Sequence, residues 1–263
     1  MDKFFEHLKN LRKVAIGMLF FFTTFYLVLL LFSRNDNQEI ANNIEKFNDS
    51  VVINKSDNDK QDIAKIKNNL AKQRDVVKKI VSENKENQEV SNEKVKENID
   101  LTIKEEIIDN SYQSLEKTDK FSKLGTVEIP KIDLNLAIFK GKPYVNCKNK
   151  EDLMLYGAVT NKKNQKMGRG NYILASHIIS NSNLLFTNIS QLGNGDTITL
   201  KDSKYSYKYR VYRKFEVSNN ETWILNDIKD YNILTLYTCV PDGKEVPDKR
   251  TVIRAVLTDI REL

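Results

Sequence analysis

Three side chains with catalytic potential stand where apolar runs of the sequence begin or end. Cys239 and His177 each end such a run, and Arg250 stands directly before another. A cysteine nucleophile needs a nearby base or cation, because little of a free thiol is ionised at neutral pH. An imidazole can serve as that base and later protonate a leaving amine, while a guanidinium can stabilise an oxyanion. The combination therefore predicts acyl transfer through a covalent intermediate.

Each of these residues also has an ordinary interpretation. A single cysteine at a strand end is more often a small buried apolar residue, and a single histidine there is more often structural. His7 precedes the long apolar segment near the amino terminus, so His177 is the one imidazole expected beyond that segment. One such histidine and two distant cysteines lack the spacing of zinc ligands. We therefore expect no metal site and no required cofactor.

The two cysteines, Cys147 and Cys239, raise the question of a disulfide. In an exported chain with only these two, a bridge is the default expectation. A bridge would consume the thiol that the predicted chemistry needs. The chemistry therefore requires a free thiol at Cys239, and we expect no functional role for Cys147.

Residues from about Leu124 onward have the composition of a compact β domain. All four prolines and eight of the nine glycines lie from Gly125 onward, so the turns of a folded domain are confined there. Short runs rich in Val, Ile, Tyr and Thr alternate with turn residues, which predicts a mostly β barrel or sandwich with short connecting helices. The expected strands are 126–129, 134–139, 172–177, 196–200, 205–210, 212–217, 233–239 and 251–258, and the expected helices are 152–156 and 183–189.

The segment from Val14 to Phe32 contains 19 uncharged, mostly apolar residues. At about 1.5 Å per residue, such a helix nearly spans a hydrocarbon core of about 30 Å. Lysines and an arginine precede it, so the positive-inside rule places residues 1–13 in the cytoplasm and the rest of the chain outside. No small-residue cleavage site follows, which favours a transmembrane anchor at residues 14–32 over a cleaved signal peptide.

Residues 33–121 form a polar segment that cannot bury a core by itself. A helical spacing that polar residues interrupt is followed by Ile63, Ile66, Leu70, Val77 and Ile80, so a helical stalk and a disordered tether are both open. The net charge of +6 arises from 42 basic and 36 acidic residues that are largely mixed in sign, which indicates solvation rather than nucleic-acid binding. Residues 122–263 are expected to form the catalytic domain.

Three blocks of the sequence resemble the sortase family, most closely its class A, housekeeping type. Residues 156–177 are similar to the stretch that leads into the catalytic histidine of that family, and residues 184–196 resemble the helix and turn after it. Residues 235–239, Thr-Leu-Tyr-Thr-Cys, match the Thr-Leu-x-Thr-Cys signature, and Arg250 stands just before the last strand. The resemblance covers the chain from about residue 124 to its end.

The resemblance implies an eight-stranded sortase-type β-barrel and a membrane-anchored cysteine transpeptidase of the Gram-positive cell surface. It implies that Cys239 is the nucleophile, His177 the general acid and base, and Arg250 the stabiliser of the transition state. In such enzymes the cysteine cleaves an LPXTG-like sorting signal between Thr and Gly, and a precursor amine resolves the thioacyl enzyme. The expected partners are surface proteins with that signal, a peptidoglycan precursor similar to lipid II, and membrane lipid. Some relatives are activated by calcium, but no acidic cluster supports that property here.

Three further residues are candidates for the substrate groove. Thr238 fits the signature beside the nucleophile, and Trp223 and Ile224 lie in a loop that such enzymes use for substrate preference. A role as packing anchors of that loop is equally open for Trp223 and Ile224. Arg254 is a poorer candidate than Arg250 for the catalytic arginine, because it lies inside the last expected strand rather than at its start.

Two other functions are open from the sequence. A hydrolytic cysteine peptidase would use the same residues but deliver the acyl group to water. A non-catalytic scaffold that binds the cell wall would leave the shared placement of Cys239, His177 and Arg250 unexplained.

Overall fold

The computed structural model of the chain describes residues 2–71, 103, 105–114, 122–141, 152–244 and 246–263. The chain divides into two compact units, residues 1–43 and residues 44–263. Helix α1 (Asp2–Ser50) begins in the first unit and ends in the second. Within the described residues, no helix is both long and apolar enough to cross a membrane, so the anchor predicted at residues 14–32 is not confirmed.

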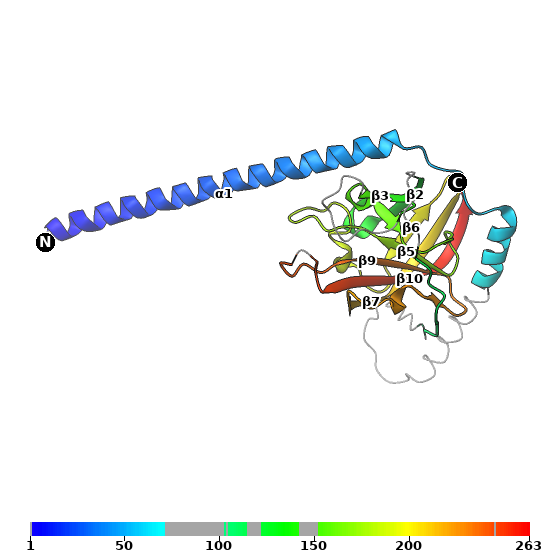
Figure 1. Cartoon of the computed structure of the whole chain (residues 1–263). Coiled ribbons are helices and arrows are strands. Elements are labelled where there is room, and N and C mark those ends of the chain that lie inside the picture. The colour runs from blue at the N-terminus through cyan, green and yellow to red at the C-terminus, as the bar shows by residue number, and fades with distance from the viewer. Residues whose placement is uncertain (1, 72–102, 104, 115–121, 142–151, 245) are drawn as a thin grey trace, which may run out of the picture. The chain divides into compact units, whose positions relative to one another are not determined.

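A closed barrel of eight strands forms the centre of the second unit, in the order β10-β7-β6-β2-β3-β4-β5-β9 (Figure 1). This confirms the predicted eight-stranded barrel. Most neighbouring strands are antiparallel, but β3 with β4 and β5 with β9 are parallel pairs. A separate two-stranded pair joins β1 (Ile107–Ile108) to β8 (Asp227–Ile228). The barrel strands are β2 (Lys123–Ile129), β3 (Leu134–Phe139), β4 (Ala158–Thr160), β5 (Asn171–Ala175), β6 (Thr197–Lys201), β7 (Tyr205–Ser218), β9 (Ile233–Cys239) and β10 (Lys249–Glu262).

The predicted strands agree with the structure where an apolar run is bounded by clear turns. Both β3 and β9 have their predicted bounds. The two strands predicted within residues 205–217 are one continuous strand, β7, because Tyr212 is skipped in the pairing with β10. This bulge lets consecutive residues, Val211 and Tyr212, both be buried, which breaks the alternation that indicates a strand. Strand β4 was not predicted, since three residues are too few to show alternation.

Short 3-10 turns take the place of the predicted helices. The helix predicted at residues 152–156 is the single turn η2 (Leu153–Leu155). The helix predicted at residues 183–189 is wrong: Leu185 has a φ of 53° and forms a bridge with Ile178. A left-handed residue cannot continue a right-handed helix, so this segment is a loop. The remaining turns are η1 (Pro130–Ile132), η3 (Ile189–Gln191) and η4 (Trp223–Leu225).

Residues 44–71 belong to the same compact unit as the barrel, which differs from the polar stalk predicted over residues 33–121. Ile44 is buried, and the Phe47 ring stacks on that of Tyr156 with centroids 4.2 Å apart. Asn58 Nδ2 donates to the hydroxyl of Tyr207, a buried residue of β7, at 2.8 Å. Phe47 and Val51 pack against the core cluster that contains Phe139, whereas Val52 and Ile53 are exposed.

Residues 60–71 form a helix that lies on the chain leading into β5. Three residues of the spacing that predicted a helical stalk, Ile63, Ile66 and Leu70, are buried, and the other two, Val77 and Ile80, lie outside the described residues. Asp62 of the same helix binds Lys166 at 3.0 Å and Arg169 at 2.5 Å. A helix was one of the two predicted alternatives, but its apolar face covers the barrel, so the compact unit begins well before residue 122.

Candidate active site

The three predicted catalytic residues lie at one edge of the barrel. Strands β5 and β9 are parallel, so their carboxyl ends meet at the same edge, where Ala175 pairs with Tyr237. Strand β10 runs antiparallel to β9 and begins at that edge, where Arg250 lies directly opposite Cys239. Directly opposed residues of antiparallel strands project to the same face with Cβ atoms about 5 Å apart. The register thus brings the guanidinium beside the thiol, and His177 follows β5 at the same edge.

A buried hydrogen bond joins the residues that precede the histidine and the cysteine. Thr238 Oγ1 donates to the carbonyl of Ser176 at 2.8 Å, and Ser176 Oγ donates to the carbonyl of Gly157 at 2.8 Å. Thr238 and Ser176 are almost fully buried, so water does not compete for these groups. The two bonds fix the backbone from which His177 and Cys239 project.

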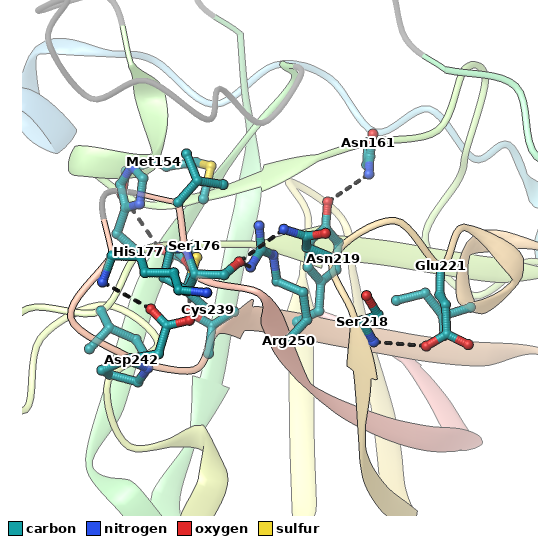
Figure 2. A pocket seen from close by; sticks show the side chains of 18 of the residues that line it. Met154, Asn161, Ser176, His177, Ser218, Asn219, Glu221, Cys239, Asp242 and Arg250 are labelled. Carbon is teal, nitrogen blue, oxygen red and sulfur yellow. Dashed lines mark hydrogen bonds between the residues drawn. The ribbon is translucent and has the colours of Figure 1, made fainter.

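A pocket of about 610 Å³ opens at this edge, lined by His177, Cys239 and Arg250 (Figure 2). The substrate-groove candidates Thr238 and Ile224 also line it. The other walls come mainly from the loops at residues 218–225, 241–244 and 246–247. Its volume lies within the range of about 300–1,000 Å³ that is usual for ligand sites.

His177 is held by a carboxylate that the sequence analysis did not single out. His177 Nε2 lies 2.6 Å from Asp152 Oδ2, and Asp152 is only 2 % exposed. The second oxygen, Oδ1, accepts from the backbone N–H of Met154 at 2.9 Å and so caps turn η2. An ionised carboxylate can only accept, so Nε2 carries its proton in this pair. Asp152 therefore sets both the orientation and the tautomer of the imidazole.

Cys239 is a free, half-buried thiol, which confirms that expectation. Burial raises the pKa of the Cys239 thiol above its usual value, the positive charge of Arg250 opposes the rise, and the negative charge of Asp242 adds to it. At neutral pH the unliganded site therefore holds mainly the neutral thiol. A proton acceptor must take part in any attack, and the imidazole at the same edge can supply it.

Arg250 is oriented by the loop between β9 and β10. Its Nη1 donates to the carbonyl of Pro247 at 2.7 Å. Asp242 organises the same loop, because its carboxylate accepts from the backbone N–H groups of Lys244 at 3.0 Å and Asp248 at 2.9 Å. The loop thus holds a planar fork of donors at the pocket rim, the geometry suited to an oxyanion.

Trp223 packs within its loop, which favours the packing-anchor alternative for this residue. Its ring stacks on Phe215 with centroids 5.6 Å apart, and its Nε1 donates to Glu221 at 3.2 Å. The same ring covers the guanidinium of Arg254 at 5.2 Å. Arg254 is fully buried in β10, away from the position of a group that meets substrate.

Among the residues that the structure describes, no group of three or more His, Cys, Asp or Glu side chains could hold a metal ion. Cys147 lies outside the described residues. The expectations about cofactors, calcium and Cys147 therefore stay predictions.

Residues 127–258, half of the chain, match the family model described as the Sortase domain. The chain belongs to the sortase family. The matched region includes Asp152, His177, Cys239 and Arg250, and so contains every side chain discussed for the edge of the barrel.

This sortase is similar in sequence to sortases of other bacteria. Sortase A of Listeria monocytogenes is 36% identical over 121 residues, which is 46% of this chain and 51% of that protein. Sortase A of Bacillus anthracis is 37% identical over 122 residues, 46% of this chain and 54% of that protein. The solved structure of Listeria monocytogenes sortase A shares 31% identity and a TM-score of 0.48, over 54% of this chain and 90% of that one. The chain spans about half the length of the curated relatives it matches.

Two residues at this edge of the barrel were missed by the sequence analysis: Asp152, which holds His177, and Tyr112, which lines the pocket. Asp152 was predicted as the start of a helix, and nothing in the local sequence links it to a histidine 25 positions later. Tyr112 lines the pocket from the segment assigned to the stalk. The signal in the sequence that could have indicated Tyr112 is that only two aromatic residues occur between residues 35 and 120.

The raised pKa of Cys239 predicts the pH dependence of its alkylation. Only the thiolate reacts, so the rate with iodoacetamide should rise with pH through a midpoint above about 8.5, the usual value for a free cysteine. Arg250→Gln removes the opposing cation and should raise the midpoint further, whereas Asp242→Asn should lower it. Lys249→Gln is the matched control, because Lys249 is exposed and paired with Glu216 at 3.3 Å. A midpoint at or below 8.5 in the unmodified chain would contradict this cause.

Proposed function

We propose that this sortase is a cysteine transpeptidase that cleaves an LPXTG-like sorting signal between Thr and Gly and joins the protein to a cell-wall precursor amine. The observation that carries the proposal is the shared edge: Cys239 opposite Arg250, with His177 at the end of the neighbouring strand, around one pocket. The sorting signal and a lipid II-like acceptor follow from the resemblance to the family. Surface proteins that carry the signal are then the acyl donors.

In the first half-reaction, Cys239 Sγ attacks the carbonyl carbon of the scissile peptide bond while His177 takes the thiol proton. The new S–C bond converts the carbonyl into a tetrahedral oxyanion. Arg250 stabilises that oxyanion, since its charge and planar donors are already fixed at the rim by the Pro247 carbonyl. Collapse of the intermediate breaks the C–N bond, and His177 returns its proton to the leaving Gly amine.

In the second half-reaction, an acceptor amine attacks the thioester carbonyl and His177 removes one of its protons. The C–S bond then breaks, and Cys239 leaves as the thiolate or thiol. The product is a new amide bond, so atoms and charges balance without any cofactor. Asp152 acts throughout as a positioning residue, because its carboxylate binds the imidazole of His177 and the backbone N–H that begins η2.

The proposal predicts a ligated product from an LPXTG peptide and an amine acceptor, measured by mass spectrometry with the full chain. Cys239→Ala should form no product, and His177→Ala and Arg250→Gln should each lower the rate by about a hundredfold or more. Lys249→Gln should retain the rate, as the neighbouring cation that lies outside the pocket lining. Release of the free acid alone, with no ligated product at saturating acceptor, would favour the hydrolytic peptidase. No turnover of any signal peptide by the folded chain would contradict both enzymes.

The positioning role of Asp152 predicts a specific effect of Asp152→Asn. Asparagine caps a helical turn as well as aspartate does, so this variant should retain η2 and change only the partner of His177. We expect kcat to fall by about ten- to a hundredfold, with the KM for peptide unchanged, because an amide no longer enforces one tautomer. The pH profile of kcat should also shift. An unchanged kcat and pH profile would show that Asp152 serves only the fold.

We further propose that residues 14–32 anchor this sortase in the membrane, with residues 1–13 in the cytoplasm and the barrel outside. The support is the run of 19 uncharged residues after a basic amino-terminal segment. The described side chains of this run, such as Phe20, Phe21 and Phe22, are exposed along α1. The full chain expressed in bacteria should stay in the membrane pellet after a carbonate wash, and its release into the supernatant would contradict the anchor.

A further inference from the structure

Residues 105–114, called the strap below, lie along the barrel although the sequence assigned them to the stalk. Strand β1 of the strap pairs with β8. The backbone N–H of Lys229 donates to the Glu106 carbonyl at 2.9 Å, and that of Lys163 donates to the Gln113 carbonyl at 2.8 Å. The strap thus connects the segment after η4 with the loop after β4. The first of these segments follows Leu225 directly, and the second begins with Asn161; both of these residues line the catalytic pocket.

Glu105 supplies the negative charge that the buried Arg254 needs. Arg254 Nη1 donates to Glu105 Oε2, and Arg213 Nη1 donates to the same oxygen at 2.7 Å. Tyr212 Oη donates to the other oxygen at 2.8 Å. Arg254 is fully buried, and no residue that the structure describes accepts a hydrogen bond from its Nε, so the guanidinium depends on Glu105 for compensation. The ion pair therefore fixes the amino-terminal end of the strap to the barrel.

Tyr112 carries the strap into the catalytic pocket. Its backbone N–H donates to Asn226 Oδ1 at 3.0 Å, and its hydroxyl donates to Asn161 Oδ1 at 2.9 Å. Asn161 Nδ2 in turn donates to Tyr237 Oη at 2.6 Å. The Tyr112 ring packs against the apolar cluster that contains Ile224. Tyr112 is thus fixed by hydrogen bonds at both its backbone and its hydroxyl, so it forms a rigid part of the pocket wall.

Tyr112, Asn161, Ile224, Leu225 and Tyr237 form one wall of the pocket, and the polar side-chain groups among them are hydrogen-bonded to one another. The hydroxyl of Tyr112, the amide of Asn161 and the hydroxyl of Tyr237 form one chain of hydrogen bonds. Asn161 and Tyr237 also line the pocket, but these polar groups are paired with one another, so the apolar contacts on this side come from the Tyr112 ring and from the aliphatic side chains of Ile224 and Leu225. An apolar side chain is the chemical group that such a surface binds.

We infer that Tyr112 is a specificity-determining residue, whose ring contacts an apolar side chain of the peptide acyl donor, and that the Glu105–Arg254 pair holds the strap in place. This inference rests on the proposed function, because it names a contact made by the donor of that reaction. It assigns to the segment before the barrel a direct part in substrate binding.

The kinetic test uses the full chain with the substitutions Tyr112→Ala and Asp109→Ala. Asp109 is an exposed residue of the same strap and serves as the matched control. Tyr112→Ala should raise the KM for the signal peptide by about tenfold or more, with the KM for the amine acceptor unchanged, while Asp109→Ala should match the unmodified chain. An unchanged peptide KM in Tyr112→Ala, or an equal effect of both substitutions, would overturn the inference.

A second test does not depend on turnover. Cys239 is alkylated with N-methylmaleimide and with the bulky, apolar N-pyrenylmaleimide, and the ratio of the two rates is compared between variants. Removing the wall should raise the relative rate of the bulky reagent in Tyr112→Ala but not in Asp109→Ala. An unchanged ratio would overturn the wall even if the peptide reaction works. Failure of the unmodified chain to process any peptide would defeat the proposed function alone, since this ratio still reports the wall.

The attachment of the strap is tested by hydrogen exchange. The amides of Tyr112 and Lys229 donate bonds that exist only while the strap is docked. Glu105→Gln should speed their exchange by at least about tenfold relative to Asp109→Ala, because the buried guanidinium loses its counter-charge. Tyr212→Phe removes one bond to Glu105 and keeps the ion pair, so it provides a milder variant with a smaller change in the same direction. Unchanged exchange in both variants would show that the ion pair does not hold the strap.

Discussion

The parallel pairing of β5 with β9 is the constraint on which the site depends. Parallel strands cannot be joined by a tight turn, so these two strands, distant in the sequence, must be brought together by the rest of the barrel. Two buried side-chain bonds fix their register: Thr235 Oγ1 to Asn171 Oδ1 at 2.7 Å, and Thr238 Oγ1 to the Ser176 carbonyl at 2.8 Å. A shift of one residue would turn Cys239 to the other face of the sheet. The register is therefore a requirement of the chemistry as well as of the fold.

Buried polar groups with specific partners recur wherever the amino-terminal segments meet the barrel. Asn58 forms a buried hydrogen bond with Tyr207, and the carboxylate of Glu105 balances the charge of the buried Arg254. Such groups are costly to bury without their partners, so each contact selects one docked position. Phe47 and Tyr112, the two aromatic residues between residues 35 and 120, both pack on the barrel. These amino-terminal segments, whose polar composition predicted a tether, are thus part of the compact unit that contains the barrel.

The sequence predicted those parts of the fold that depend on local patterns. Strands β3 and β9 end where turn residues follow apolar runs, and the placement of Arg250 near Cys239 follows from two adjacent antiparallel strands. His177 and Cys239 were grouped from their residue types and from their places at the ends of apolar runs, and the family resemblance then assigned their roles. The parallel pairing that brings them to one edge was not predicted, because no local pattern specifies it. Asp152 could not be predicted, since its contact with the imidazole depends on how a single turn is placed in space. The docked segments were missed because composition reports an average, whereas a few well-placed residues determine their packing.

The central claim, that this edge of the barrel forms a covalent acyl enzyme, is tested most directly by the intact mass of the full chain. The chain is mixed with an LPXTG peptide in the absence of an amine, so that the intermediate accumulates, and the reaction is quenched with acid. We expect a mass increase equal to the peptide fragment up to Thr, mapped to Cys239 and removed by hydroxylamine. A folded chain with a free Cys239 thiol that acquires no such adduct, or acquires it at another residue, would contradict the claim.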